Sequence, residues 1–121
     1  MAEIRIFETG ATRDADSNKH DFEGFLSPLF IEMFGEYMTK HRVQANGELR
    51  ASDNWQKGIP LTEYMKSGWR HFRQWWRLHR GYSCVDEKGN PVTMEDALAG
   101  VAFNVMGYAH EWLKKNRPEV L

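Results

Sequence analysis

Glu32 and Glu36 are the first residues of this sequence whose type and spacing suggest chemistry. In a helix, positions four apart share one face, so the two carboxylates repel each other unless a cation lies between them. Mg²⁺ is one such cation, because proteins commonly hold it with one or two carboxylates together with substrate phosphates. The pair also fits a solvated acidic edge balanced by Lys40, and the spacing leaves both interpretations open.

Asp96 and Asn104 form a second polar pair. Eight helical positions separate them, which is only about 80° around the axis, so one helix face could present both. Asn104 stands in the apolar stretch 101–106, where a buried amide needs partners in a neighbouring backbone or in a ligand. Asp96 follows Thr93 by three residues, a spacing that fits a helix cap as well as a ligand.

The stretch 68–76 mixes cations with aromatic rings, a combination that could bind phosphate and stack a base. Arg70 and His71 are adjacent, so they point about 100° apart, and only one of them can face a given cleft directly. An aromatic stripe at helical spacing also fits a packed core. A nucleic-acid surface would instead need the basic row of this helix, which comprises Lys66, Arg70, Arg73, Arg77 and Arg80.

The charge balance argues against a nucleic-acid partner. Sixteen Lys and Arg residues oppose seventeen Asp and Glu residues, and the net charge of −1 excludes a global basic field. Any anion site must therefore be local. The chain has no Walker loop, dinucleotide-binding glycine motif, nucleophilic serine elbow or zinc-ligand spacing, so the motifs give no support to covalent catalysis.

Cysteine usage and hydropathy point to a reducing, aqueous compartment. Cys84 is the sole cysteine, so no intrachain disulfide can form. The first 22 residues lack the apolar core of about 7–15 residues found in a signal peptide, and no apolar run reaches the roughly 18 residues of a membrane span. We therefore expect a cytoplasmic protein with no membrane partner.

Three amphipathic helices must position these residues. We expect them over residues 28–43, 61–80 and 94–115 of a single all-α domain, a small helical bundle that spans residues 1–121. Ser27 before Pro28 marks the first start, Gly81 the second end, and Thr93 the third start.

The segments outside the helices are predicted to be irregular. We expect residues 1–26 to form an extended arm, with a short strand at 3–7, turn formers between residues 10 and 19, and an apolar end at 22–26. That end could dock on the body of the protein or on a neighbouring subunit. Residues 44–60 form a long loop around Trp55, and a loop of this length usually has a function. Residues 116–121 form a tail.

Apolar stripes on the second and third helices predict how the bundle packs. The second stripe comprises Leu61, Met65, Gly68, Trp69, Phe72, Trp75, Trp76, Leu78 and His79, and the third comprises Met94, Leu98, Val101, Val105, Tyr108 and Trp112. We expect these stripes to form the seam between helices, with Gly100 and Gly107 providing a second, close-packing face. Five Trp, seven Phe and four Tyr residues indicate both a dense core and an oligomer interface.

Three blocks of the sequence carry a family resemblance. They are residues 53–60 (Asp-Asn-Trp-Gln-Lys-Gly-Ile-Pro), the segment from Trp69-Arg70-His71-Phe72 to Trp75, and residues 97–104 with the downstream Glu111. In this order, they resemble the phage-associated dATP/dGTP diphosphohydrolase N-terminal domain family, which looks like a divergent branch of the MazG-type all-α nucleotide pyrophosphohydrolases. The resemblance runs from about residue 19 to residue 111. Where MazG-type enzymes carry an EExxE block, this chain has Glu32 and Glu36.

This resemblance implies Mg²⁺- or Mn²⁺-dependent hydrolysis of a purine (deoxy)nucleoside triphosphate to monophosphate and pyrophosphate, in an oligomer of helical subunits. A phage or prophage context would place it in the host cytoplasm. The resemblance assigns metal ligation to Glu32, Glu36 and Asp96, and catalysis to Glu32, Glu36 and His71. It assigns substrate contacts to Asn54, Trp55, Lys57, Trp69, Arg70 and Asn104, with Lys57 and Arg70 on phosphate and Trp55 or Trp69 stacking on the base.

A different class of function remains open at this point. The aromatic helical surface could serve a non-catalytic phage interaction protein or a nucleotide-binding protein without turnover. The partners expected are therefore a purine nucleotide and further copies of the chain.

Overall fold

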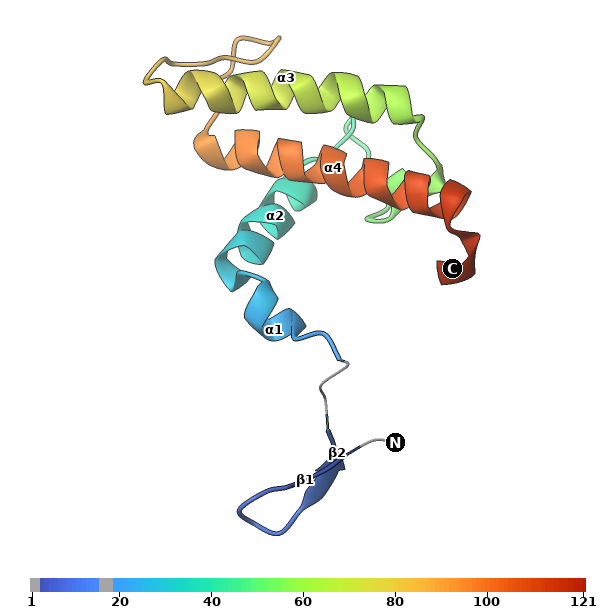
Figure 1. Cartoon of the computed structure of the whole chain (residues 1–121). Coiled ribbons are helices and arrows are strands. Elements are labelled where there is room, and N and C mark those ends of the chain that lie inside the picture. Colours follow the sequence, from blue (N-terminus) through green and yellow to red (C-terminus); the bar gives the residue numbers. More distant parts are fainter. Residues whose placement is uncertain (1–2, 16–18) are drawn as a thin grey trace.

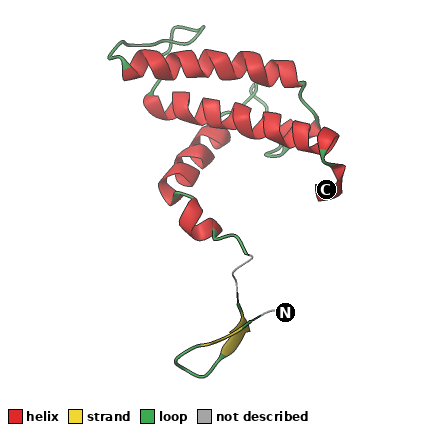
Figure 2. Cartoon of the chain, viewed as in Figure 1, coloured by secondary structure: helices red, strands yellow, loops and turns green. Residues whose placement is uncertain are grey.

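The computed structural model describes residues 3–15 and 19–121, and most of them are helical (Figures 1 and 2). The main helices are α2 (Pro28–Lys40), α3 (Leu61–His79) and α4 (Met94–Asn116). The three predicted helices are confirmed, with a correction to the first, which ends three residues earlier than expected. The chain turns at His41, and Val43 then forms an isolated β-bridge with Leu49.

The N-terminal segment contains a small hairpin and a short helix. β1 (Ile4–Ile6) pairs antiparallel with β2 (Thr12–Asp14), and α1 (Phe22–Phe25) follows. The strand expected at residues 3–7 is confirmed as β1, whereas β2 was not predicted. Figure 1 shows the hairpin apart from the three main helices. Of the expected turn formers, Asp16, Ser17 and Asn18 lie outside the described residues.

Capping residues set the helix boundaries as expected. The Ser27 hydroxyl accepts a hydrogen bond from the Phe30 N–H at 3.2 Å, and the Thr93 hydroxyl accepts one from the Asp96 N–H at 3.1 Å. At the end of α3, Gly81 has φ +87°, and its N–H donates to Leu78 O while the Tyr82 N–H donates to Arg77 O. This is a Schellman motif, which needs the left-handed conformation that glycine adopts without strain.

α3 and α4 lie side by side in antiparallel orientation, and α2 contacts α4 (Figure 1). Small residues of α4 face α3. A Cβ at Gly100 would lie 2.5 Å from two atoms of the His71 ring, and a Cβ at Gly107 would overlap the Tyr64 ring. The two rings therefore rest directly on the α4 backbone, which confirms the close-packing face predicted at the two glycines.

The expected apolar seam is wrong in part. The buried residues of α3 are Tyr64 and Gln74, and those of α4 are Ala97, Ala99, Gly100, Asn104 and Gly107. By contrast, several large side chains of the two predicted stripes are exposed, among them Met65, Trp69, Phe72, Trp76 and Val105. Others, such as Leu61, Trp75 and Leu98, are half-buried. The reason is geometric: Gly and Ala let two helix backbones approach closely, and the large apolar side chains are left on the outside of the pair.

The connecting segments fold into short turns. The long loop contains a 3₁₀ turn, η1 (Asn54–Lys57), and a second 3₁₀ turn, η2 (Pro118–Val120), follows α4. Between α3 and α4, Val85 and Pro91 form a β-bridge around a tight turn that contains Gly89 at φ +82°. None of the helices in the described part of the chain combines the length and apolarity needed to cross a lipid bilayer.

Candidate functional site

A cavity of about 750 Å³ opens where the last turn of α2, the segment 41–55, α3, α4 and the turn at 86–92 meet. Its volume lies within the range of about 300–1,000 Å³ that is typical of small-molecule sites. Cations, carboxylates and imidazoles all contribute to its lining. They include Lys40, Arg42, Arg50, Arg70, Asp86, Glu87, Asp96, His41 and His71.

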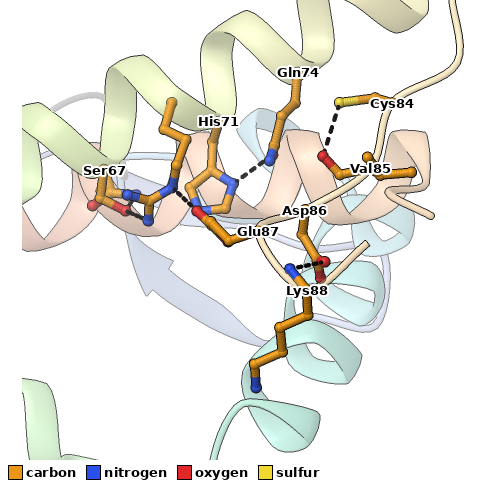
Figure 3. Close-up of polar contacts among 10 residues, drawn as sticks. Ser67, His71, Gln74, Cys84, Val85, Asp86, Glu87 and Lys88 are labelled. Atoms are coloured by element: carbon orange, nitrogen blue, oxygen red, sulfur yellow. Dashed lines mark hydrogen bonds and ion pairs between the residues drawn. The ribbon is translucent and has the colours of Figure 1, made fainter. Parts of the chain in front are cut away.

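His71 occupies the middle of α3 and faces α4. Its ring rests on Gly100, and its Nδ1 lies 3.0 Å from Oε1 of Gln74, one turn further along the helix (Figure 3). With that amide oxygen as the acceptor, Nδ1 carries the ring proton and the lone pair lies on Nε2. Burial lowers the pKa of His71, and the hydrogen bond to Gln74 opposes this effect only in part. The imidazole is therefore neutral at pH 7.

Two ion pairs cross the cavity. Lys40 at the end of α2 pairs with Asp96 in the first turn of α4. Arg70 Nε lies 3.2 Å from Oε1 of Glu87, which belongs to the turn after α3 and is labelled in Figure 3. Burial raises the pKa of Asp96, but the hydrogen bond and charge of Lys40, together with the hydrogen bonds of Thr93, outweigh burial, so that the net shift of the pKa is downward. Both cations thus have a carboxylate partner with which an anionic ligand would compete.

Asn104 is buried, with 3% of its surface exposed. Its Nδ2 donates to Gly100 O at 2.7 Å and to the Ser67 hydroxyl at 3.2 Å. The Ser67 hydroxyl also accepts a hydrogen bond at 3.2 Å from the guanidinium of Arg70. The buried amide of Asn104 therefore finds its partners in the backbone of α4 and in α3. Through the Ser67 hydroxyl it also connects α4 to Arg70, one of the cations that line the cavity.

Trp55 supplies an aromatic wall. It lies in η1, half-buried, with its ring 4.9 Å from that of His110 and 6.3 Å from that of Phe103, both in edge-to-face geometry. Asn54, its neighbour, also lines the cavity. Contacts with α4 therefore hold one side of the tryptophan, while the ring lines a polar cavity.

The structure brings together Asn54, Trp55, Arg70, His71, Asp96 and Asn104 from the residues proposed on sequence grounds. It does not bring Glu32, Glu36, Lys57 or Trp69 to the cavity. Glu32 and Glu36 are exposed on earlier turns of α2, of which only the end, residues 37–40, reaches the lining. Trp69 lines a different, apolar groove between α3 and α4.

Other lining residues were missed in the sequence. Asp86 and Glu87 belong to the connector after α3. Because functional residues concentrate in connecting segments, this acidic pair near Gly89 could have indicated a functional site. Asp86 also organises its own turn, since its Oδ1 accepts the N–H groups of Lys88 and Asn90, both at 2.9 Å. Lys40 was considered only as a neighbour of the acidic edge.

No preformed metal centre is evident among residues 3–15 and 19–121, because no group of three or more His, Cys, Asp or Glu side chains gathers there. Comparison of the chain with protein-family models, with curated proteins and with solved structures gives no match.

Proposed function

We propose that this cavity binds a purine (deoxy)nucleoside triphosphate and supports its Mg²⁺-dependent hydrolysis to monophosphate and pyrophosphate, in a phage or prophage nucleotide metabolism. The reaction and the substrate class rest on the resemblance to the dATP/dGTP diphosphohydrolase N-terminal domain. The observation that carries the proposal is the meeting, in one cavity, of two cation–carboxylate pairs, a neutral imidazole and a tryptophan.

Phosphate binding falls to Arg70 and Lys40. A guanidinium offers parallel donors that match phosphate oxygens, and an ammonium offers a compact charge. In the structure each is occupied by a carboxylate, and the Arg70–Glu87 pair is about half exposed on the Arg70 side, so that exchanging it for a polyphosphate costs little. The phosphates take the place of Glu87 and Asp96 as partners of the two cations.

The donor set suits Mg²⁺ held jointly with substrate. Mg²⁺ needs only one or two protein carboxylates when phosphate oxygens and water complete its shell. Glu87 and Asp96, released from their cations, would be those ligands. When bound, the ion would neutralise phosphate charge and acidify a coordinated water. These carboxylates replace Glu32 and Glu36 in the proposal, because the latter pair lies outside the cavity.

His71 acts as the proton acceptor in this proposal. Its neutral imidazole is oriented by Gln74 and by contact with Gly100, and the lone pair on Nε2 can take a proton from the attacking water. Trp55 provides the ring on which the base stacks, since a tryptophan face stacks on any base and a purine offers a large π-surface.

Product analysis with each dNTP and Mg²⁺ tests the proposal. Wild-type protein should release pyrophosphate, and His71→Gln should lower kcat by about 100-fold or more, as expected for loss of a proton acceptor. Arg70→Gln should lower kcat/KM, whereas Arg73→Gln, at an exposed position of α3 outside the cavity lining, should retain wild-type values. Glu32→Gln and Glu36→Gln should also behave as wild type.

Binding of tripolyphosphate without Mg²⁺ gives a separate test of the anion site. Arg70→Gln should weaken binding, and Glu87→Gln should tighten it by about two- to fivefold, because it removes the competitor of an exposed ion pair. The proposal fails if no dNTP yields pyrophosphate, or if Arg70→Gln and Arg73→Gln are indistinguishable in both assays. Tight nucleotide binding without turnover would instead indicate a nucleotide-binding protein that does not hydrolyse its ligand.

A further inference from the structure

We propose that the Ser67 hydroxyl donates a hydrogen bond to an oxygen of the phosphate that Arg70 binds, an inference that rests on the proposed function. Ser67, labelled in Figure 3, lies in α3 and lines the polar cavity together with Arg70, His71 and Gln74 of the same helix. These four residues are spaced by three and four positions, so they share one helix face. Ser67 therefore belongs to the cavity wall, next to the cation assigned to the phosphates.

Asn104 occupies one lone pair of the Ser67 hydroxyl oxygen. The orientation of its amide is fixed by Gly100, because a carbonyl oxygen can only accept, so the amide atom 2.7 Å from Gly100 O must be the nitrogen Nδ2. The other N–H of this nitrogen is donated to Ser67 Oγ at 3.2 Å. Since Asn104 is only 3% exposed, water has little access to this hydrogen bond.

Arg70 occupies the other lone pair of the same oxygen. Its guanidinium donates to Ser67 Oγ at 3.2 Å, from one turn further along α3. A serine hydroxyl has two lone pairs and one proton, so the proton must point away from both donors. Serine in a helix often donates to a carbonyl oxygen of the preceding turn, but within residues 3–15 and 19–121 the Ser67 hydroxyl donates to no group. The proton is therefore available to a ligand in the cavity.

The surroundings of this hydroxyl favour an anionic oxygen as its acceptor. Two N–H donors, one of them on a cation, polarise the hydroxyl and strengthen it as a donor. A phosphate that pairs with the Arg70 guanidinium places its oxygens beside Ser67, and hydrogen bonds to such charged acceptors are short and strong. Asn104 spends both N–H groups of its amide within the protein, so it is a positioning residue that acts on the ligand through Ser67.

Binding of tripolyphosphate without Mg²⁺, followed by calorimetry, tests this donor. Ser67→Ala should weaken binding by about 10-fold, as expected for the loss of a hydrogen bond to a charged oxygen. Ser67→Thr keeps a hydroxyl and should restore most of the affinity. Thr62→Ala is the matched control, because it removes a hydroxyl from an exposed position of α3 outside the cavity lining. This variant should bind as wild type does.

A double-mutant cycle separates donation by Ser67 from an effect on the orientation of Arg70. If Ser67 donates directly to phosphate, Ser67→Ala should weaken binding in the Arg70→Gln background as well. Asn104→Ala frees one lone pair of Ser67 and lets its proton turn away from the ligand. It should therefore weaken binding in the wild-type chain but have no further effect in the Ser67→Ala background, a coupling that a purely structural role would not produce.

Three results would overturn this inference. The first is wild-type affinity of Ser67→Ala for tripolyphosphate, and the second is an effect of Ser67→Ala that disappears in the Arg70→Gln background. The third is a loss of affinity for dNTP alone, because the acceptor would then belong to the nucleoside and not to a phosphate. Failure of the proposed function is distinguishable from these results, since Arg70→Gln would then bind tripolyphosphate as tightly as wild type does.

Discussion

At the scale of single residues, burial and hydrogen bonding give His71 its properties. The ring is enclosed between Gln74 and Gly100, and the charged groups that act on it from other elements are Glu87 and Asp96, with Arg70 on its own helix. The two carboxylates favour the protonated ring, whereas burial and the neighbouring guanidinium disfavour it, and burial has the largest effect. The imidazole of His71 is therefore neutral, although the side chains of Arg70, Glu87 and Asp96 near it are charged.

This environment predicts a loss of stability in mild acid. Burial lowers the pKa of both His71 and His41, so the folded protein binds fewer protons than the unfolded chain just below pH 6.5, the ordinary histidine value. The stability that these two histidines contribute to the free energy of unfolding should therefore be complete above about pH 6.5, and it should be lost as the pH falls through their pKa values in the folded protein. Urea unfolding at about pH 7.5, 6.5 and 5.5 measures this decrease.

A matched pair of variants separates the effect of His71 on this pH dependence from that of the rest of the protein. His71→Gln should reduce the slope of stability against pH, whereas His79→Gln, at an exposed position near the end of α3, should preserve it. The lowered pKa of Asp96 contributes stability that is lost only below the ordinary carboxylate range, outside this window. An unfolding free energy independent of pH between about 7.5 and 5.5 would contradict the prediction.

At the scale of elements, the contact between α3 and α4 depends on residues without bulk. Gly100 and Gly107 receive the rings of His71 and Tyr64, and Tyr64 is only 2% exposed. The same close approach places His71 in the cavity wall and leaves Trp69 and Phe72 outside. The packing of one helix pair therefore produces both the polar cavity and an exposed apolar groove between α3 and α4.

Gly100→Ala tests this dependence. The new methyl group would lie 2.5 Å from the His71 ring, so ring or helix must move, and overpacking of this kind costs about 1–3 kcal/mol of unfolding free energy. Urea denaturation should show that loss. Gly35→Ala is the control, because nothing lies within 4 Å of a Cβ there and alanine favours a helix interior by up to about 1 kcal/mol. Equal effects of the two changes would disprove the close contact.

At the scale of the whole molecule, the N-terminal segment and the helical pair are arranged as separate parts. The residues of α1 are all exposed, and Phe22 and Phe25 are 65% and 72% accessible. The β1–β2 hairpin lies away from α3 and α4 in Figure 1. The segment expected to dock through residues 22–26 therefore does not pack on the body of its own chain.

Removal of residues 1–26 should consequently leave the helical core intact. The truncated chain begins at Ser27, which retains the cap of α2, and loses no residue that lines the polar cavity or the apolar groove between α3 and α4. Its unfolding free energy in urea should agree with that of the full chain within the extrapolation error of about 10–15%. A clear loss of stability would show that the segment covers part of the body.

Local sequence was sufficient for the helices and their ends. Ser27, Gly81 and Thr93 indicated helix ends through hydrogen bonds made within a few residues of the chain. Gly100 and Gly107 indicated a close contact between helices. Capping and helical periodicity depend on neighbours in the chain, so they can be read before any tertiary contact is known.

Which face of each helix points inward was decided by tertiary packing. Periodicity predicted the stripe through Trp69 and Val105 as the seam, but close approach of two backbones favours the face with small residues, so the stripe lies outside. The membership of the cavity likewise depends on contacts between distant segments, such as Lys40 with Asp96 and Arg70 with Glu87. No local pattern specifies which distant segments meet, because their meeting depends on the packing of the whole chain.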